Sequence, residues 1–153
     1  MRIVHRDEVE PAREDDLKFT GRVERRDLLP PQQHAGLRLG WVRFERGART
    51  NWHTHDGEQV LYVIDGEGCV GTHSETVPIG PGDVVRIPAE EKHWHGARSG
   101  GRLVHIAITS GVETRWPKPP DRPAPCEPTV SGDAHSTRSR KGTSQGSRRK
   151  NIG

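Results

Sequence analysis

Short apolar runs separated by glycine and proline recur through the middle of the chain. In the run 39–45 (LGWVRFE) apolar residues alternate with charged ones, which is typical of a half-buried strand. The run 59–64 (QVLYVI) is β-branched and aromatic, and the Asp65-Gly66 pair after it is a strong hairpin signal. Further strands are expected at 68–74, 76–79, 83–87 and 102–109.

No amphipathic segment of helix length separates these runs. Parallel strands need a long crossover, usually a helix, so a βαβ architecture is excluded. Many short strands between glycine and proline turns predict an all-β antiparallel sandwich or closed barrel, here over residues 34–113. Residues 1–33 are highly charged with short apolar patches, and they predict an N-terminal arm with short strands that Pro30-Pro31 ends.

The composition changes near Trp116. Only 29% of the chain is hydrophobic, and the deficit is concentrated in the C-terminal segment. Six of the twelve prolines lie between Pro117 and Pro128, and Ser, Gly, Lys and Arg dominate after them. Such a segment buries too little apolar surface to offset its ordering entropy. Residues 114–153 are therefore expected to form a disordered basic tail.

The positive charge of the chain belongs to this tail. Residues 117–153 hold eight Lys/Arg and three Asp/Glu, a net of +5, so the 116 residues before them carry −2 of the total +3. A basic tail can contact nucleic acid or an anionic surface. Because no aromatic residue is interleaved with these charges, a solvated tail is the simpler interpretation, and no nucleic acid is expected to bind the domain.

Two cysteines are present, Cys69 in a strand-like run and Cys126 in the expected tail. Neither belongs to a C-x-x-C pair, and a structural disulfide to a disordered segment is not expected. The first residues lack the apolar core of a signal peptide, and no run approaches the length of a membrane span. These features favour a cytoplasmic protein with no membrane partner.

Two stretches contain closely spaced histidines. His53 and His55 are one residue apart, so in an extended chain both side chains point to the same side, and Gln59 follows four positions later. In a chain with nine histidines such a pair also arises by chance. The second stretch, 82–95, is a strand that ends at Pro88, with His93 five residues on.

Together these stretches resemble the two-part signature of the cupins, Gly-x5-His-x-His-x3-(Glu/Gln)-x6-Gly and Gly-x5-Pro-x-Gly-x2-His. The positions that match are Gly47, His53, His55, Gln59 and Gly66 in the first part and Gly82, Pro88 and His93 in the second. Glu90 stands where the family usually has glycine, so a different backbone is expected in the turn before His93. The resemblance covers roughly residues 36–112 and implies a double-stranded β-helix, or jelly-roll, barrel.

The resemblance also implies one divalent transition metal, held by His53, His55, Gln59 and His93. Imidazoles and an amide oxygen suit manganese, iron, nickel, zinc or copper. Many cupins have glutamate where this chain has Gln59, and a neutral side chain there favours an anionic or enolisable ligand. The adjacent Glu58 is the alternative ligand in register, and the spacing from His55 and to Gly66 favours Gln59.

The residues around His93 and His105 resemble a subgroup of small manganese cupins that includes bacterial hydroxynitrile lyases, which makes manganese the first choice. In that subgroup the histidine that matches His105 faces the pocket and is proposed to act as the base, so His105 is the candidate general base. Without the family, a buried core histidine is the simpler account of His105. His95 shares the strand parity of His93 and either lines the pocket or lies outside it.

These features predict a metal-dependent cupin enzyme that acts on a small organic molecule, through hydroxynitrile-lyase-like C–C cleavage or dioxygenase chemistry. The alternative is a non-catalytic cupin module that binds a metal or a metabolite. The family is usually dimeric or larger, so a homodimer or higher homo-oligomer is expected. The apolar lining of the pocket is expected from Val42, Leu61, Val63 and Leu103.

Overall fold

The computed structural model describes residues 1–13, 15–30 and 36–127. Within these ranges the chain forms one short 3-10 helix, Arg6–Glu8 (η1), and twelve strands, which confirms the all-β prediction. The strands are Phe19–Thr20 (β1), Val23–Leu29 (β2), Arg38–Phe44 (β3), Arg49–Thr50 (β4), Thr54–His55 (β5), Gln59–Gly66 (β6), Gly68–Thr72 (β7), Thr76–Ile79 (β8), Val84–Ile87 (β9), His93–Ala97 (β10), Leu103–Thr109 (β11) and Thr114–Arg115 (β12). No helix in the described ranges is long and apolar enough to cross a membrane.

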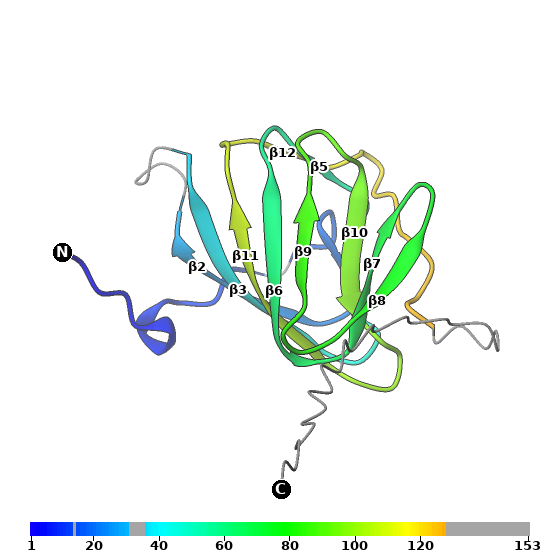
Figure 1. Ribbon diagram of the computed structural model, residues 1–153, viewed down its shortest axis with the longest axis horizontal. Coiled ribbons are helices and arrows are strands. Elements are labelled where there is room, and N and C mark those ends of the chain that lie inside the picture. Colours follow the sequence, from blue (N-terminus) through cyan, green and yellow to red (C-terminus); the bar gives the residue numbers. More distant parts are fainter. Residues whose placement is uncertain (14, 31–35, 128–153) are drawn as a thin grey trace, which may run out of the picture.

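Ten of the strands form two five-stranded sheets that pack against each other, as Figure 1 shows. One sheet has the order β2-β3-β11-β6-β9 and the other β1-β4-β10-β7-β8, while β5 and β12 form a separate pair. Neighbouring strands are antiparallel, and several neighbours, such as β3 and β11, are distant in sequence. This topology confirms the predicted jelly-roll barrel.

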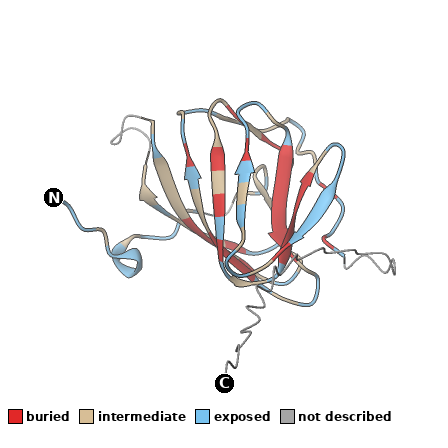
Figure 2. Cartoon of the chain, in the orientation of Figure 1, coloured by how far each residue is buried: buried red, intermediate tan, exposed pale blue. Residues whose placement is uncertain are grey.

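The alternation of side chains in β6 shows how the sequence sets the inner face. Gln59, Leu61 and Val63 are buried on the inner face. Tyr62 and Ile64, which follow Leu61 and Val63 directly, are exposed on the outer face. The bands of buried and less buried residues along the strands are visible in Figure 2.

The apolar core fills one end of the barrel. Phe44, Leu61, Val63 and Leu103 are fully buried and pack with residues of the opposite sheet. All four residues expected to line the pocket belong to this core, and of the four Val42 also lines the cavity described below. Polar residues occupy the inner positions at the other end.

The N-terminal arm contributes to both sheets. Strand β2 pairs with β3 along most of its length, and β1 pairs with β4. Arg25 and Asp27 of β2 line the cavity, Arg25 partly buried and Asp27 exposed. The arm is thus an edge of each sheet, and it also supplies charged side chains to the cavity.

The expectation of disorder from residue 114 onward is wrong for residues 114–127. Strand β12 pairs with β5, the Arg49 side chain donates to the carbonyl of Pro123 at 2.9 Å, and the Trp52 amide donates to the carbonyl of Asp121 at 2.8 Å. Backbone and side-chain hydrogen bonds hold this segment in place, so its low apolar content does not make it disordered. Residues 128–153, the rest of the expected tail, lie outside the described residues.

The expectation that the cysteines do not pair is also wrong. Cys69 on β7 and Cys126 form a disulfide, with their Cα atoms 5.7 Å apart. Both cysteines are buried in a small cluster with Trp94, against which Trp52 packs. The bridge closes a loop with a sequence separation of 57 and fixes the C-terminal segment to the barrel.

Replacement of Cys126 by Ser should lower the free energy of unfolding by about 2–4 kcal/mol, because the unfolded chain gains the entropy that the bridge removes. Urea unfolding with and without reductant measures this difference. The wild-type midpoint should fall in reductant, and that of Cys126→Ser should not change. Two free thiols titrated in the denatured, unreduced wild-type protein would contradict the bridge.

Candidate metal centre

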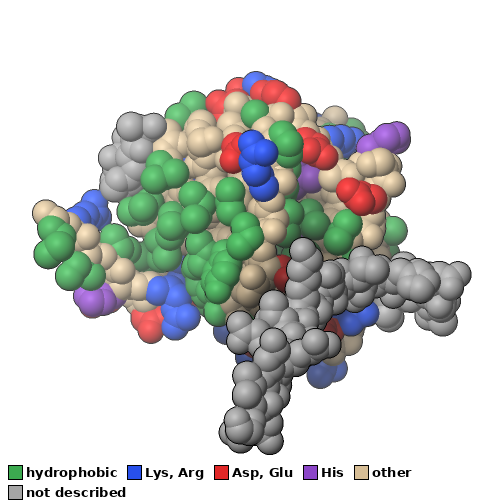
Figure 3. Space-filling model, in the orientation of Figure 1, with side chains coloured by type: hydrophobic (Ala, Val, Ile, Leu, Met, Phe, Trp, Pro, Cys, Tyr) green, Lys and Arg blue, Asp and Glu red, His purple; other side chains and the backbone are tan. Residues whose placement is uncertain are grey.

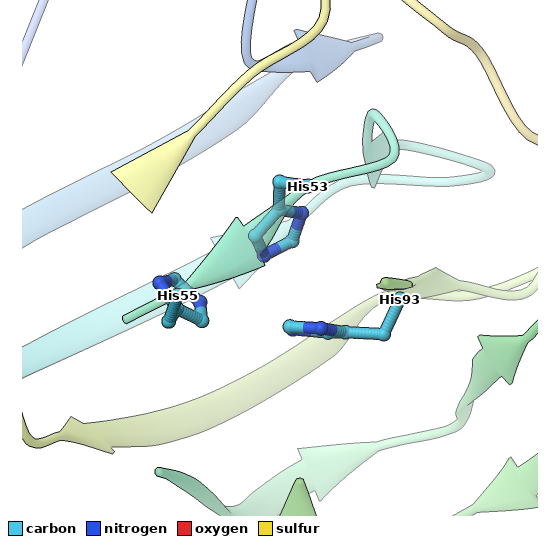
Figure 4. A group of neighbouring side chains, drawn as sticks. All are labelled: His53, His55 and His93. Atoms are coloured by element: carbon cyan, nitrogen blue, oxygen red, sulfur yellow. The ribbon is translucent and has the colours of Figure 1, made fainter. Parts of the chain in front are cut away.

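Three histidines converge at the polar end of the barrel, as Figure 4 shows. His55 lies on β5, His53 just before it, and His93 begins β10. One ligand nitrogen from each lies within 4.8 Å of the others, and all three residues are buried. The backbones of His53 and His93 exchange two hydrogen bonds, of 3.1 and 3.0 Å, so the strands themselves place these two side chains next to each other.

Two of the rings are held by backbone carbonyls. Nδ1 of His53 lies 2.8 Å from the carbonyl oxygen of Asn51, and Nδ1 of His93 lies 2.8 Å from that of Glu91. A carbonyl oxygen can only accept a hydrogen bond, so Nδ1 of each ring carries the proton. The lone pair is then on Nε2, which is the arrangement that a metal ligand requires.

The third ring is held by the C-terminal segment. Nδ1 of His55 lies 2.9 Å from the hydroxyl of Thr114 on β12, and Nε2 of His55 is buried without a hydrogen-bond partner among the described residues. Trp116 stacks on the ring of His53, with centroids 4.3 Å apart and planes at 23°. Sequence reasoning missed both contacts, because it placed Thr114 and Trp116 in or beside a disordered tail.

Gln59 points into the barrel and Glu58 points out. The Gln59 amide donates to the hydroxyl of Thr109 at 3.0 Å, which leaves its oxygen 3.0 Å from Nε2 of His93. Glu58 instead pairs with Arg86 at 2.6 Å on the surface. The structure thus has the register that the sequence spacing favoured, with a neutral side chain beside the histidines.

The donor set fits a divalent transition metal. Burial, and then the neighbouring His93, lowers the pKa of His55 to about 3; burial also lowers the pKa of His93, and that of His53 well below its usual value. All three imidazoles are therefore neutral near pH 7, as ligands must be. Three imidazole nitrogens and an amide oxygen are suitable ligands for manganese, iron, nickel, copper or zinc.

Two further histidines form a pair beside this group. Nε2 of His105 on β11 lies 3.0 Å from Nδ1 of His95 on β10, and both rings are buried. The other ring nitrogens, Nδ1 of His105 and Nε2 of His95, have no partner among the described residues. Burial lowers the pKa of His105 to about 4 and that of His95 well below its usual value, so both rings are neutral near pH 7 and each has one nitrogen that carries no proton.

A cavity of about 390 Å³ connects these groups. The metal-site residues His53, His55 and Gln59 line it together with the His95–His105 pair. Apolar wall is supplied by Phe19, Leu29, Leu39, Val42, Phe44, Ala107, Val112 and Trp116. Its size is that of a site for a small organic molecule, and polar groups converge at one place in it.

The turn before His93 does not differ in the way the sequence suggested. Glu90 has φ of +66°, the left-handed region that glycine favours. A side chain in this region costs roughly 1–2 kcal/mol, so Glu90 keeps the expected glycine conformation at an energetic cost. Its amide donates to the carbonyl of His55 at 2.8 Å, which ties the turn to the metal-site residues.

Comparison with known proteins agrees with this geometry. Residues 40–109 match the family model described as a cupin domain. The chain is 43% identical over 96 residues to the (R)-mandelonitrile lyase of Granulicella tundricola, a match that covers 62% of this chain and 73% of that protein. The chain belongs to the cupin family. This cupin also superposes on a solved cupin-like protein from Thermotoga maritima with a TM-score of 0.66 and 34% identity, over 76% of this chain and 89% of that one.

A second group of relatives carries another name. The cupin is 31% identical over 86 residues to the acireductone dioxygenase of Microcystis aeruginosa, which covers 52% of this chain and 44% of that protein. This cupin therefore spans less than half the length of that relative.

Replacement of Thr114 by Val should weaken the binding of Mn²⁺ about 10- to 100-fold, because the ring of His55 loses the hydroxyl that orients it. Titration of the metal-free protein with Mn²⁺, followed by calorimetry, measures the change. Thr114→Ser keeps the hydroxyl and should bind Mn²⁺ almost as the wild type does. Equal affinities of the Val variant and the wild type would show that the hydroxyl does not support the site.

Proposed function

We propose that this cupin is a metal-dependent lyase that cleaves a C–C bond in a small 2-hydroxynitrile. The observation that carries the proposal is the His95–His105 pair, which is buried, hydrogen-bonded and in the same cavity as the metal-site residues. The 43% identity to a relative named (R)-mandelonitrile lyase supports the same chemistry.

The proposed mechanism divides the work between two sets of residues. His53, His55, Gln59 and His93 would hold one divalent metal, manganese in our proposal. A bound divalent ion polarises a substrate oxygen and lowers the pKa of a hydroxyl group.

His105 then takes the proton of the substrate hydroxyl as general base. The electron pair of the O–H bond forms the C=O bond, and the C–C pair leaves with cyanide. The hydrogen bond between His105 and His95 gives the proton a second position, from which it returns to cyanide to release HCN.

Dioxygenase chemistry is the second candidate. The relatives named acireductone dioxygenase support it, although the match covers less than half of each of them. A module that binds a metal or metabolite without turnover is the remaining alternative. The three candidates share the metal-site residues and differ in what His105 does.

Replacement of His105 by Ala should lower the turnover of mandelonitrile at least 100-fold in the manganese-loaded protein, because the proton acceptor is lost. The release of benzaldehyde measures turnover, and elemental analysis should show unchanged metal content. His53→Ala should lose the metal itself. His73→Ala, in an exposed turn, is the control and should match the wild type.

Other outcomes of these assays distinguish the three candidate functions. Undiminished turnover in His105→Ala excludes the base role. A wild-type protein that is loaded with metal, consumes O₂ with an acireductone and leaves mandelonitrile intact would be a dioxygenase. Inactivity in both assays would favour the binding module.

We also propose that a second copy of the chain covers the outer face of the β2-β3-β11-β6-β9 sheet. Tyr62, Ile64, Val84 and Ile108 are exposed there, and the register places Tyr62 beside Val84 on one side and Ile106 on the other. Figure 3 shows the hydrophobic side chains gathered over β3, β11 and β6. Contiguous apolar patches of this kind are typical of interaction surfaces.

The double change of Tyr62 and Ile108 to Lys should convert the wild-type oligomer to a monomer in sedimentation velocity, because charge on this face opposes its burial. Val77→Lys, at an exposed apolar position on β8 in the other sheet, should leave the oligomer intact. A monomeric wild type at 100 µM, roughly the upper end of weak dimer affinities, would contradict the proposal.

A cytoplasmic location stays a prediction. The Cys69–Cys126 bridge weighs against it, because structural disulfides are rare in reducing compartments.

A further inference from the structure

An arginine occupies an inner position at the polar end of the barrel. Arg38 begins β3 and pairs in register with Thr109, the residue that holds Gln59. Arg38 lines the cavity and is partly buried. An inward-facing charge in a small barrel needs a partner, since its removal from water is costly.

The protein supplies few acceptors for the Arg38 guanidinium. Arg38 takes part in none of the ion pairs found among the described residues. Its Nη1 donates to the hydroxyl of Thr114 at 2.9 Å, and its Nε is buried without an acceptor. One of the three guanidinium nitrogens therefore has a good acceptor.

The third nitrogen faces the wrong group. Nη2 of Arg38 lies 3.3 Å from Nδ1 of His55. When Nε2 of His55 serves as a metal ligand, Nδ1 carries the proton and donates to Thr114, so Nη2 meets a second donor. Nε and Nη2 form one edge of the guanidinium, and this edge is left without an acceptor. A carboxylate fits such an edge with two parallel hydrogen bonds.

The net positive charge of the cavity wall also favours an anionic ligand. Its wall carries three cationic side chains, Lys18, Arg25 and Arg38, and a single carboxylate among the described residues, Asp27, which pairs with Arg25 at 3.3 Å. The histidines and Gln59 are neutral, and a bound divalent metal adds further positive charge. Lys18 also pairs with a carboxylate, that of Asp15 at 3.5 Å, so a neutral ligand would leave the charges of Arg38 and the metal without a counter-charge among the described residues.

We infer that this site also binds a small 2-hydroxy or 2-oxo carboxylate whose carboxylate pairs with Arg38. Because Arg38 adjoins His55, a carboxylate held there brings the oxygen on the neighbouring carbon to the metal-site residues. The substituent beyond that carbon then meets the apolar wall at Val42 and Ala107. The inference rests on the proposed function for the identity of the site. A 2-hydroxynitrile is neutral, so the carboxylate is a second ligand that competes with it for the same cavity.

Calorimetric titration of the manganese-loaded protein with (R)-mandelate and with (R)-mandelamide tests this inference. The two probes share their shape and differ in charge. Mandelate should bind at least tenfold more tightly than the amide, and Arg38→Gln should remove about tenfold or more of the mandelate affinity without affecting the amide. Arg86→Gln, which removes a surface cation, should bind mandelate as the wild type does.

Arg38→Lys separates charge from geometry. It keeps the charge and loses the planar fork, so it should recover part of the affinity that Arg38→Gln loses. Metal content is measured for each variant, because Arg38 contacts His55 and Thr114. If Arg38→Gln loses the metal, the test uses Arg38→Lys protein that retains its full metal content. Weaker binding of mandelate than in the wild type supports the inference, and binding equal to that of the wild type overturns it.

Equal affinity for mandelate and mandelamide in the wild type would also overturn it. These measurements need no turnover. If the protein binds mandelate selectively but does not cleave mandelonitrile, the proposed lyase is refuted and the carboxylate site is supported. If it cleaves mandelonitrile but does not bind mandelate selectively, the carboxylate site is refuted and the proposed lyase is supported.

Discussion

The candidate site depends on the two backbone hydrogen bonds between His53 and His93. They join two segments from distant parts of the sequence, and the pairing places both imidazoles on the inside. Alternation along the short strand then turns His55 to the same side and Thr54 away from it. Gln59 follows at the start of β6, in register with Thr109 on β11. The ligand positions are thus set by strand pairing, which is a rigid support for a binding site.

A second layer, built from the C-terminal segment, holds the rings in orientation. Thr114 binds the outer nitrogen of His55 and Trp116 covers His53, while the Cys69–Cys126 bridge anchors the end of the segment on β7. The C-terminal partners in these contacts, Thr114, Trp116 and Cys126, lie outside the part of the chain that matches the cupin model, residues 40–109. The barrel supplies the ligands, and a segment particular to the C-terminal side of the chain supplies much of their support.

The sequence predicted what is local and missed what is not. Alternation of apolar and charged residues predicted β3, and runs of β-branched and other apolar residues predicted β6 and β11, because both patterns are local properties of a strand. Spacing alone favoured Gln59 over Glu58 for the inner position. The His95–His105 contact and the Cys69–Cys126 bridge join residues on different elements, which no local pattern specifies. Composition failed for residues 114–127 because hydrogen bonds and a covalent bond, which composition does not report, hold that segment.

The neutral side chain of Gln59 links the two parts of the chemistry. A glutamate at this position would supply negative charge and a basic oxygen beside the histidines. With an amide there, none of the four residues supplies negative charge, which is consistent with a ligand that pairs its own charge with Arg38, whose Nε has no acceptor among the described residues. Proton transfer likewise has to use a group outside the four metal-site residues. The buried pair of His95 and His105 is the group in the cavity that is neutral near pH 7 and has nitrogens without partners among the described residues. Because position 59 is glutamine and not glutamate, both the proton acceptor and the negative charge come from outside the four metal-site residues.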